Sequence, residues 1–317
     1  MFNAISHFFS QLFASYSPEA YEINNLFLEY LILAGVIVAL VAGLVIIGAI
    51  RFRSNKRPKE PPQIFGNKKL EITWTVIPFL ILVFFFILTL RAMVEINTPV
   101  GEYPKPDIVI VAHQWWWDMR YPGYKIITAN ELHIPVGKKL LMAVKSADVI
   151  HDWWVPDLGR KIDAIPGRTN YTWIEADSAG TYLGNCAEFC GAEHAWMRIK
   201  VIAQTPYEFN QWVNNQQRIP SQPKDSTAVL GQMLFQKETC GDCHAIAGTS
   251  ANAHVGPDLT HIASRTTILS GRLTNTRENL FRWLANPQKV KPGAHMPDFR
   301  FNKNQLNELV AYLEGLK

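Results

Sequence analysis

This sequence contains few cysteines and few charged residues for its length. Only 4 of its 317 residues are cysteine, and Asp, Glu, Lys and Arg together make up 18%. It contains no Walker-type glycine loop and no GxGxxG pattern, so no motif supports nucleotide binding. The formal net charge of +4 is too small to indicate a nucleic-acid partner. The hydrophobic fraction is 48%, which indicates that part of the chain lies in lipid.

Two long stretches of the chain carry no charge. Residues 31–50 are LILAGVIVALVAGLVIIGAI, and residues 72–90 are ITWTVIPFLILVFFFILTL. Each is long enough to cross a hydrocarbon core of about 30 Å at about 1.5 Å per residue. A pair of buried core helices is the alternative, but soluble helices seldom stay apolar on every face for so long. The pattern predicts a two-helix transmembrane anchor over residues 25–98, with Pro78 inside its second helix.

The loop between these stretches is basic. From residue 51 to residue 71 it contains seven Lys and Arg residues against two Glu. Short basic loops stay in the cytoplasm, so we expect both ends of the chain, including everything after residue 95, to lie outside. Residues 1–24 lack the basic start of an ordinary signal peptide, and we expect an N-terminal extracytoplasmic segment there.

The sequence changes character after the second stretch. Runs such as DIVIVAHQWWWDMRY and MRIKVIA are rich in β-branched and aromatic residues, and turn signals such as Pro-Gly at 122–123 separate them. Short strands at this spacing predict a β-sandwich or barrel, which we bound at residues 99–217.

The segment CAEFCGAEHAWM within this domain places Cys186 and Cys190 four residues apart and then adds His194 and Met197. A disulfide, a buried structural pair and a metal site are the three possible interpretations. A disulfide needs only the two cysteines and leaves the histidine and the methionine unexplained. Zinc has little use for a thioether, whereas copper suits thiolate, imidazole and a weak axial methionine together.

A single blue-copper centre uses only one cysteine, so the second thiolate needs another metal ion or another purpose. Two thiolates that bridge two coppers satisfy this requirement, and each copper then needs one imidazole. His151, in the segment SADVIHDWWVPDLG, is the best candidate for the second histidine. A lone histidine after an apolar strand is more often a core residue, but the Cys-Cys-His-Met loop favours the metal interpretation.

A second cysteine pair lies near the end of the chain. Cys240, Cys243 and His244 form C-x-x-C-H, the attachment signature of a c-type haem. A redox pair or a zinc pair is the alternative, and the appended histidine and the outside location argue against both. Residues 218–227 are rich in Pro, Ser and polar residues and predict a linker before a haem domain at 228–317.

Several of these segments together resemble subunit II of the haem–copper cytochrome c oxidases. The segments are VIHDWWVPDLGRKIDAIPGRTN, CAEFCGAEHAWM, EITWTVIP and AHQWWWDMRY, and the resemblance covers roughly residues 20–215. It implies a cupredoxin fold with a binuclear copper centre, CuA. The implied ligands are His151, Cys186, Cys190, His194, Met197 and, weakly, the backbone carbonyl of Glu188.

The resemblance also implies roles for three further residues. The Glu188 carboxylate would help to hold a magnesium ion shared with subunit I, and a solvated loop acid is the alternative. Trp115 would lie at the surface near copper and pass electrons in, whereas packing is expected for two of the three consecutive tryptophans at 115–117. Glu71 would lie by the entrance of a proton channel, with a simple interfacial acid as the alternative.

Residues 228–317 resemble a small class I cytochrome c. Gly231 and Phe235 match its packed N-terminal helix, LNELVAYLEGLK matches its closing helix, and Pro257 matches the residue whose carbonyl orients the axial histidine. Met296 stands where the family has its axial methionine, and a thioether raises the potential as an electron acceptor needs. Three histidines compete with it for this position: His254, His261 and His295.

The expected molecule is a multidomain membrane protein. It combines a two-helix transmembrane hairpin, a cupredoxin-like β-sandwich or barrel, and an all-α class I cytochrome c domain. The two soluble modules show no strong charge contrast, with 10 basic against 7 acidic residues in 226–317 and 11 against 12 in 101–205. Electrostatic docking between them is therefore only weakly supported by the sequence.

The function that the resemblance implies is that of subunit II of a proton-pumping terminal cytochrome c oxidase in a bacterial cytoplasmic membrane. An external donor, such as a cytochrome c or a quinol-oxidising complex, would reduce the covalent haem c. Electrons would then pass to CuA and to subunit I, where oxygen is reduced to water, with subunit III as a further partner. A copper and haem subunit of a nitric oxide reductase and a stand-alone membrane-tethered electron carrier are the alternatives.

Overall fold

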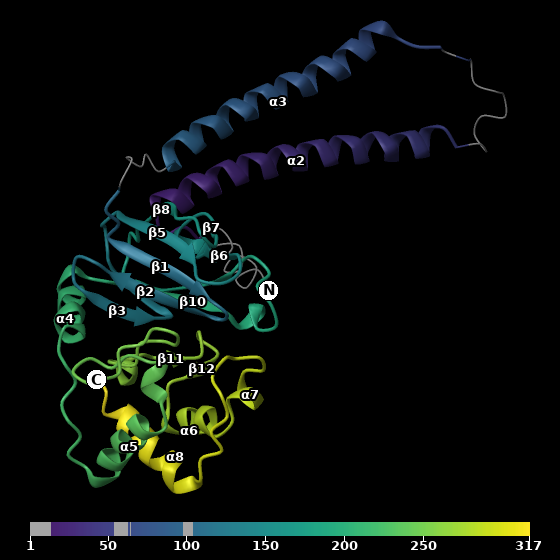
Figure 1. Cartoon of the computed structure of the whole chain (residues 1–317). Coiled ribbons are helices and arrows are strands. Elements are labelled where there is room, and N and C mark those ends of the chain that lie inside the picture. The colour runs from purple at the N-terminus through teal and green to yellow at the C-terminus, as the bar shows by residue number, and fades with distance from the viewer. Residues whose placement is uncertain (1–13, 54–62, 64, 98–103) are drawn as a thin grey trace, which may run out of the picture. The chain divides into compact units, whose positions relative to one another are not determined.

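The structure of the chain is a computed structural model that describes residues 14–53, 63, 65–97 and 104–317 (Figure 1). Residues 1–13 of the predicted N-terminal segment and residues 54–62 and 64 of the predicted cytoplasmic loop lie outside the described residues. The chain divides into two compact units. Among the described residues, one unit holds 21–97, and the other holds 14–20 and 104–317.

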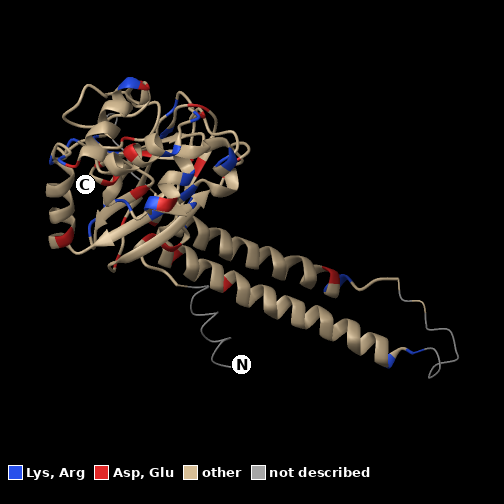
Figure 2. Ribbon diagram, turned by 90° about the horizontal axis from the view of Figure 1, so that it is seen from below, with Lys and Arg blue, Asp and Glu red and all other residues tan. Residues whose placement is uncertain are grey.

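The first unit consists of two long helices, α2 (Pro18–Arg51) and α3 (Lys68–Ile96). The first three residues of α2 belong to the second unit. Most of their length carries no Lys, Arg, Asp or Glu (Figure 2), and almost all of their side chains are exposed. Helices of 34 and 29 residues that are apolar on every face suit a membrane rather than water. The predicted hairpin of membrane-length helices is confirmed, and both helices extend beyond the uncharged stretches.

Two local features define this hairpin. The Asn67 side chain accepts a hydrogen bond from the backbone N–H of Leu70 at 3.3 Å and caps the start of α3. The Tyr30 ring of α2 lies 4.4 Å from the Phe85 ring of α3, and the Tyr30 hydroxyl lies 3.1 Å from Thr89 Oγ1. Pro78 lies inside α3 without ending it.

The cupredoxin domain contains two five-stranded sheets. The first has the order β3-β2-β1-β5-β8 and the second the order β4-β10-β9-β6-β7. The strands are β1 (Ile108–His113), β2 (Trp116–Tyr121), β3 (Ile126–Ala129), β4 (Glu131–Pro135), β5 (Leu140–Ser146), β6 (His151–Trp154), β7 (Ile162–Ala164), β8 (Asn170–Ile174), β9 (Gly180–Cys186) and β10 (Arg198–Gln204). The helical elements are η2 (Pro156–Leu158), η3 (His194–Trp196) and α4 (Pro206–Gln216).

The core of this domain lies between the two sheets. Ile110 of β1 stands opposite Met119 of antiparallel β2 and Val144 of parallel β5. These side chains belong to the same buried cluster as Leu132 of β4 and Val201 of β10, which are in the other sheet. Two sheets that share one apolar core make a sandwich, so the predicted cupredoxin-like β-sandwich is confirmed.

The cytochrome c domain is mainly helical, as predicted. Its helices are α5 (Ser226–Lys237), α6 (Arg277–Ala285), α7 (Pro287–Val290) and α8 (Lys303–Glu314), with short turns η4 (Cys240–Asp242) and η5 (Ile262–Ser264). The structure adds one feature that the sequence did not predict, a small hairpin of β11 (Thr267–Ile268) and β12 (Leu273–Thr274).

Helices α5 and α8 cross where the sequence placed a glycine. A Cβ atom on Gly231 would lie only 1.9 Å from the backbone carbonyl oxygen of Glu308. The Phe235 ring meets the Tyr312 ring edge-on nearby, at 5.8 Å between centroids. The crossing therefore has no room for a side chain at position 231.

We expect Gly231→Ala to lower the free energy of unfolding of the cytochrome c domain by about 1–3 kcal/mol, because α5 and α8 must move apart. Guanidinium unfolding followed by circular dichroism measures this change. Gly123→Ala is the control, because no atom lies within 4 Å of its added Cβ, and its effect should stay within about 0.5 kcal/mol. Equal stability of the two variants would contradict the tight crossing.

Candidate metal centres

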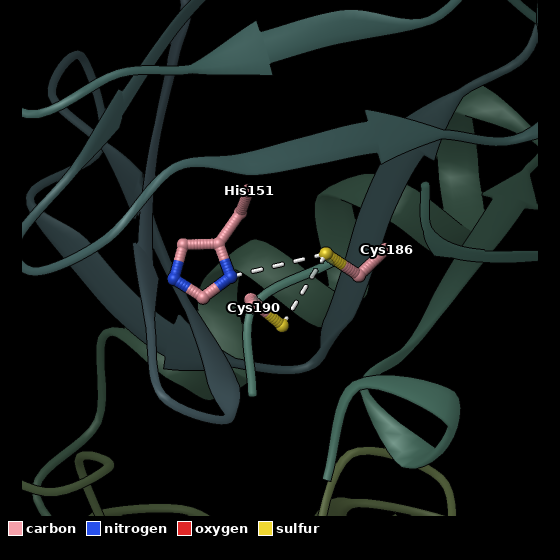
Figure 3. A group of neighbouring side chains, drawn as sticks. All are labelled: His151, Cys186 and Cys190. Atoms are coloured by element: carbon pink, nitrogen blue, oxygen red, sulfur yellow. Dashed lines mark hydrogen bonds between the residues drawn. The ribbon is translucent and has the colours of Figure 1, made fainter. Parts of the chain in front are cut away.

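The structure brings the five predicted copper-binding side chains together at one end of the second sheet. His151 opens β6 and Cys186 ends β9, while Cys190, His194 and Met197 belong to the loop from β9 to β10. Cys186 Sγ lies 3.8 Å from Cys190 Sγ and 3.8 Å from His151 Nδ1 (Figure 3). Cys190 Sγ lies 3.6 Å from His194 Nδ1 and 3.9 Å from Met197 Sδ.

The arrangement of donors around the two sulfurs is two-ended. Cys186 has His151 on its side, and the backbone carbonyl oxygen of Glu188 lies 3.3 Å from its sulfur. Cys190 has His194 and Met197 on its side. An imidazole at each end of a thiol pair fits two metal ions with bridging thiolates better than it fits one ion.

The two cysteines are free and buried. Their sulfurs share a hydrogen bond, which lowers the pKa of the Cys186 thiol and raises the pKa of Cys190. The Cys186 thiol therefore loses its proton more easily than Cys190 does. Because thiolates are the form that binds metal, Cys186 is the sulfur of the pair that is more readily available to a cation.

Asp148 orients His151, and the sequence analysis missed it. Its Oδ1 atom lies 2.8 Å from His151 Nε2, and its carboxylate also accepts the backbone N–H of Gln114 at 2.6 Å. Burial alone would lower the pKa of His151, but the hydrogen bonds to Asp148 and Cys186 outweigh it and raise that pKa. An Nε2–H bound to Asp148 leaves Nδ1 directed at the thiols. An aspartate three residues before a histidine is too common a pattern to have identified this role.

The two acids of the copper loop have different surroundings. Glu188 is exposed, and its carboxylate accepts the backbone N–H of Phe189 at 3.1 Å. Glu193 is only 4% exposed and forms an ion pair with Arg272 of the cytochrome c domain, with 2.7 Å between Oε2 and Nη1. The magnesium role of Glu188 stays a prediction, whereas Glu193 is a contact that sequence reasoning missed.

The three consecutive tryptophans lie in different surroundings. Trp117 is fully buried in the sandwich core and meets Trp153 edge-on, and Trp116 stacks on His113 with 4.3 Å between ring centroids. Trp115 is 7% exposed, and its indole N–H donates to the backbone carbonyl of Cys190 at 3.0 Å. Its expected surface position is therefore wrong, because residues of the cytochrome c domain cover it.

Glu71 lies in the first turn of α3, outside the soluble domains. It is exposed, and its carboxylate accepts the backbone N–H of Asn67 at 3.3 Å. This contact belongs to the helix cap, so the proton-channel role stays a prediction.

The C-x-x-C-H segment follows α5 and forms the turn η4. His244 Nδ1 lies 2.7 Å from the backbone carbonyl oxygen of Pro257, as expected from the resemblance. Burial lowers the pKa of His244. A neutral ring with Nδ1–H bound to this carbonyl has Nε2 free for an iron ion, and the half-buried thiols of Cys240 and Cys243 stand beside it in sequence. This donor set fits a covalent haem.

The candidates for the second axial ligand differ in their contacts. Met296 is half-buried and packs against the apolar core of the cytochrome c domain. His261 Nε2 is hydrogen-bonded to the backbone carbonyl oxygen of Gln216 at 3.1 Å, and His254 is exposed. These contacts favour the methionine over these two histidines, and the third competitor, His295, is exposed.

Comparison with known proteins agrees with this architecture. Residues 6–92 match the family "Cytochrome C oxidase subunit II, transmembrane domain", residues 125–204 match "Cytochrome C oxidase subunit II, periplasmic domain", and residues 228–317 match "Cytochrome c". Cytochrome c oxidase subunit 2 of Alkalihalophilus pseudofirmus is 36% identical over 309 residues, which are 95% of this chain and 89% of the relative.

Two further similarities have the same character. Cytochrome c oxidase subunit 2 of Bacillus subtilis is 33% identical over 288 residues, 84% of this chain and 81% of that relative. The crystal structure of the periplasmic domain of subunit II of cytochrome oxidase of Bradyrhizobium japonicum is 37% identical. The match covers 36% of this chain and 95% of the chain in that structure, with a TM-score of 0.34.

A membrane hairpin, a cupredoxin with a thiol-pair metal site and a cytochrome c domain define a membrane-anchored electron-transfer protein. More specifically, the chain belongs to the cytochrome c oxidase subunit II family and carries a cytochrome c domain at its C-terminal end. Such a chain is the electron-transfer subunit of an oxidase. The family implies copper in the cupredoxin, haem in the cytochrome c domain and subunit I as a partner.

We expect Asp148→Asn to weaken copper binding about 10- to 100-fold, because His151 loses the carboxylate that orients it. Competition with a copper chelator, followed by the optical spectrum of the copper site, measures this change. Asp177→Asn is the matched control, because its side chain is exposed. Equal copper affinity in the two variants would show that Asp148 does not support the site.

Proposed function

We propose that this chain is the subunit II that delivers single electrons from an external donor to the oxygen-reducing subunit of a proton-pumping cytochrome c oxidase. Electrons enter at the haem domain, pass to the copper domain and continue to subunit I, where oxygen becomes water. The complex lies in a bacterial cytoplasmic membrane with both soluble domains outside, and subunit III and a cytochrome c or quinol-oxidising donor are its further partners. The names of the relatives favour this function over a nitric oxide reductase subunit or a stand-alone carrier.

The two-ended set of donors around Cys186 and Cys190 carries the proposal. Each sulfur has its own imidazole, at 3.8 Å and 3.6 Å, and the pair is flanked by a thioether on one side and a backbone carbonyl on the other. We assign these residues as the ligands of a binuclear copper centre: His151, Cys186, Cys190, His194, Met197 and the Glu188 carbonyl. The Glu188 carboxylate is the proposed ligand of magnesium at the subunit I boundary.

The protein contributes rigidity and exclusion of water to this site. A copper pair supplies one-electron chemistry, in which one electron is gained or lost and no bond or proton moves. Cys186 N–H donates to the Met197 carbonyl at 2.9 Å, and Ala187 N–H donates to the Asp152 carbonyl at 3.0 Å, so backbone hydrogen bonds hold the loop in place. Because every strong donor is a protein group, no position is left for a substrate. The site can therefore relay electrons but not activate oxygen.

The haem domain supplies the first station of this route. The two thiols of C-x-x-C-H would attach the porphyrin, and His244, oriented by the Pro257 carbonyl, would bind the iron. Met296 is the proposed second ligand of the iron, and its thioether would raise the reduction potential. Glu71 is proposed as an acid at the entrance of a proton path in the partner subunit.

The experiment that tests the function is an EPR and optical spectrum of the purified chain, together with metal analysis. We expect a c-type haem spectrum and the signal of one electron shared by two coppers. Cys186→Ser should replace the shared signal by that of an isolated copper or remove it, because one bridge is lost. An isolated-copper signal in the unaltered chain, or zinc in place of copper, would refute the binuclear assignment.

We expect Met296→Ala to abolish the charge-transfer band at the red edge of the oxidised haem spectrum, because this band reports sulfur on ferric iron. The Soret band should remain, since Cys240 and Cys243 still attach the haem. Met233→Ala is the control, because Met233 is 61% exposed on α5. Survival of the band in Met296→Ala would mean that another residue binds the iron.

A further inference from the structure

A buried acid of the copper domain finds its hydrogen-bond donors on the haem domain. Glu131 of β4 is 2% exposed. Its carboxylate accepts the backbone N–H groups of Thr266 at 3.0 Å and Thr267 at 2.9 Å, and both hydroxyls at 2.5 and 2.7 Å. Burial alone would raise the pKa of Glu131, but the hydrogen bonds from Thr266 and Thr267 outweigh it and hold that pKa below its usual value. Glu131 is therefore a buried charge whose hydrogen bonds come from across the interface, while Lys200 Nζ of its own domain lies 3.7 Å from its Oε1 atom.

A buried base of the haem domain makes the reciprocal contact. Lys291, just after α7, is 5% exposed, and its Nζ donates to the backbone carbonyl of Trp115 at 2.6 Å. The Ser270 hydroxyl, from the β11–β12 hairpin, lies 2.8 Å from the same carbonyl and 3.1 Å from Asn130 Oδ1. The carbonyl of Trp115 thus has two hydrogen-bond donors from the haem domain.

From these contacts we propose that the haem domain docks on its own copper domain in one fixed orientation. Glu131 and Lys291 are the positioning residues that hold it there, with Trp115 at the shared contact. This proposal rests on the proposed function only in giving the contact a role in electron transfer, since the docking itself is a property of the folded chain. It differs from a loosely tethered carrier, for which a linker would supply only a high local concentration.

The physical reason for a single orientation is the cost of burying charge. A carboxylate or an ammonium loses its hydration when two surfaces close over it, and only well-placed hydrogen bonds offset this loss. In any other docked arrangement Glu131 would lose water without gaining the donors of Thr266 and Thr267. The same holds for Lys291 and the Trp115 carbonyl. Paired charges of this kind set the register of an interface.

The tip of the β11–β12 hairpin supports the proposal independently. Leu269 and Ser270 both have φ of 56°, in the left-handed region that side chains other than glycine rarely adopt, and Gly271 follows at 79°. Such strain persists where surrounding contacts fix the backbone. Ser270 is 1% exposed, and its hydrogen bonds to the copper domain are contacts of this kind.

The same hairpin region reaches the copper loop. Arg272 forms the ion pair with Glu193 described above, and its guanidinium lies 4.7 Å from the centre of the Trp196 ring. Trp196 is in η3, between the proposed ligands His194 and Met197. The haem domain therefore contacts the loop that carries the copper ligands.

Trp115 connects the two sites in this arrangement. Its indole N–H donates to the carbonyl of Cys190 on the copper side. On the haem side, a Cβ on Gly293 would lie 3.3 Å from its ring, and the His295 ring lies 6.4 Å away, between centroids. His295 directly precedes Met296, the proposed iron ligand. The fixed docking thus places one aromatic ring between the iron-binding segment and the copper loop.

The first test is hydrogen exchange on the full chain loaded with copper and haem. In Glu131→Gln the amides of Thr266 and Thr267 should exchange at least 10-fold faster than in the unaltered chain, while the amides of β1 keep their rates. Asp177→Asn, which also removes one acidic charge at an exposed position, should change neither set. Unaltered exchange at Thr266 and Thr267 in Glu131→Gln would overturn the role of Glu131.

The second test is electron transfer from haem to copper after flash photoreduction, in solvents of increasing viscosity. A docked chain should transfer electrons at a rate independent of viscosity. Lys291→Gln and Glu131→Gln should slow the transfer at least 10-fold and make it viscosity-dependent, because the domains must first find each other. Lys289→Gln is the control for Lys291→Gln, since Lys289 is an exposed residue of α7.

The outcomes separate the docking from the function. A viscosity-dependent rate in the unaltered chain, equal to that of the variants, would overturn fixed docking while leaving both metal sites in place. Loss of the binuclear copper spectrum in the unaltered chain would instead overturn the proposed function. The exchange rates of Thr266 and Thr267 would still report the docking in that case.

Discussion

The site depends on holding two cysteine sulfurs close together without letting them bond. The Sγ atoms of Cys186 and Cys190 lie 3.8 Å apart. Cys186 ends strand β9, and Cys190 lies in the loop that follows this strand. Cys186 pairs with Trp153 on β6, the strand that His151 opens. The sheet therefore fixes one imidazole and one thiol relative to each other, and the loop adds the remaining donors. A stiff framework suits an electron relay, because little has to move when the charge of the site changes.

The second constraint is the closure of the haem domain over β4 of the second sheet, the turn between β1 and β2, and the copper loop. The interface contains charged groups from both sides, and each finds its partner across it: Glu131 with Thr266 and Thr267, Lys291 with Trp115, and Arg272 with Glu193. Each domain therefore supplies hydrogen-bond or ion-pair partners to buried groups of the other. The indole of Trp115 is covered as a consequence and lies against Gly293 and His295 of the haem domain.

Much of the fold and of the site was predictable because it depends on local pattern. Two uncharged stretches of membrane length predicted α2 and α3, and runs rich in β-branched and aromatic residues between turn signals predicted the sandwich. The copper loop places its donors within twelve residues of sequence, and C-x-x-C-H is contiguous. His151 was identified only through the need of the copper loop for a second imidazole, because nothing near it in sequence distinguishes a ligand from a core histidine.

The sequence by itself determined the three domains, their order and the chemistry of the donor groups, because these follow from short-range composition and spacing. Only the tertiary structure decided that Asp148 orients His151, that Trp115 is buried and that Glu131 and Lys291 hold the domains together. Glu131 meets partners 135 and 136 residues away, and Lys291 meets one 176 residues away. A carboxylate or an amine looks the same in sequence whether it faces water or a distant backbone. Its surroundings exist only after the chain has folded.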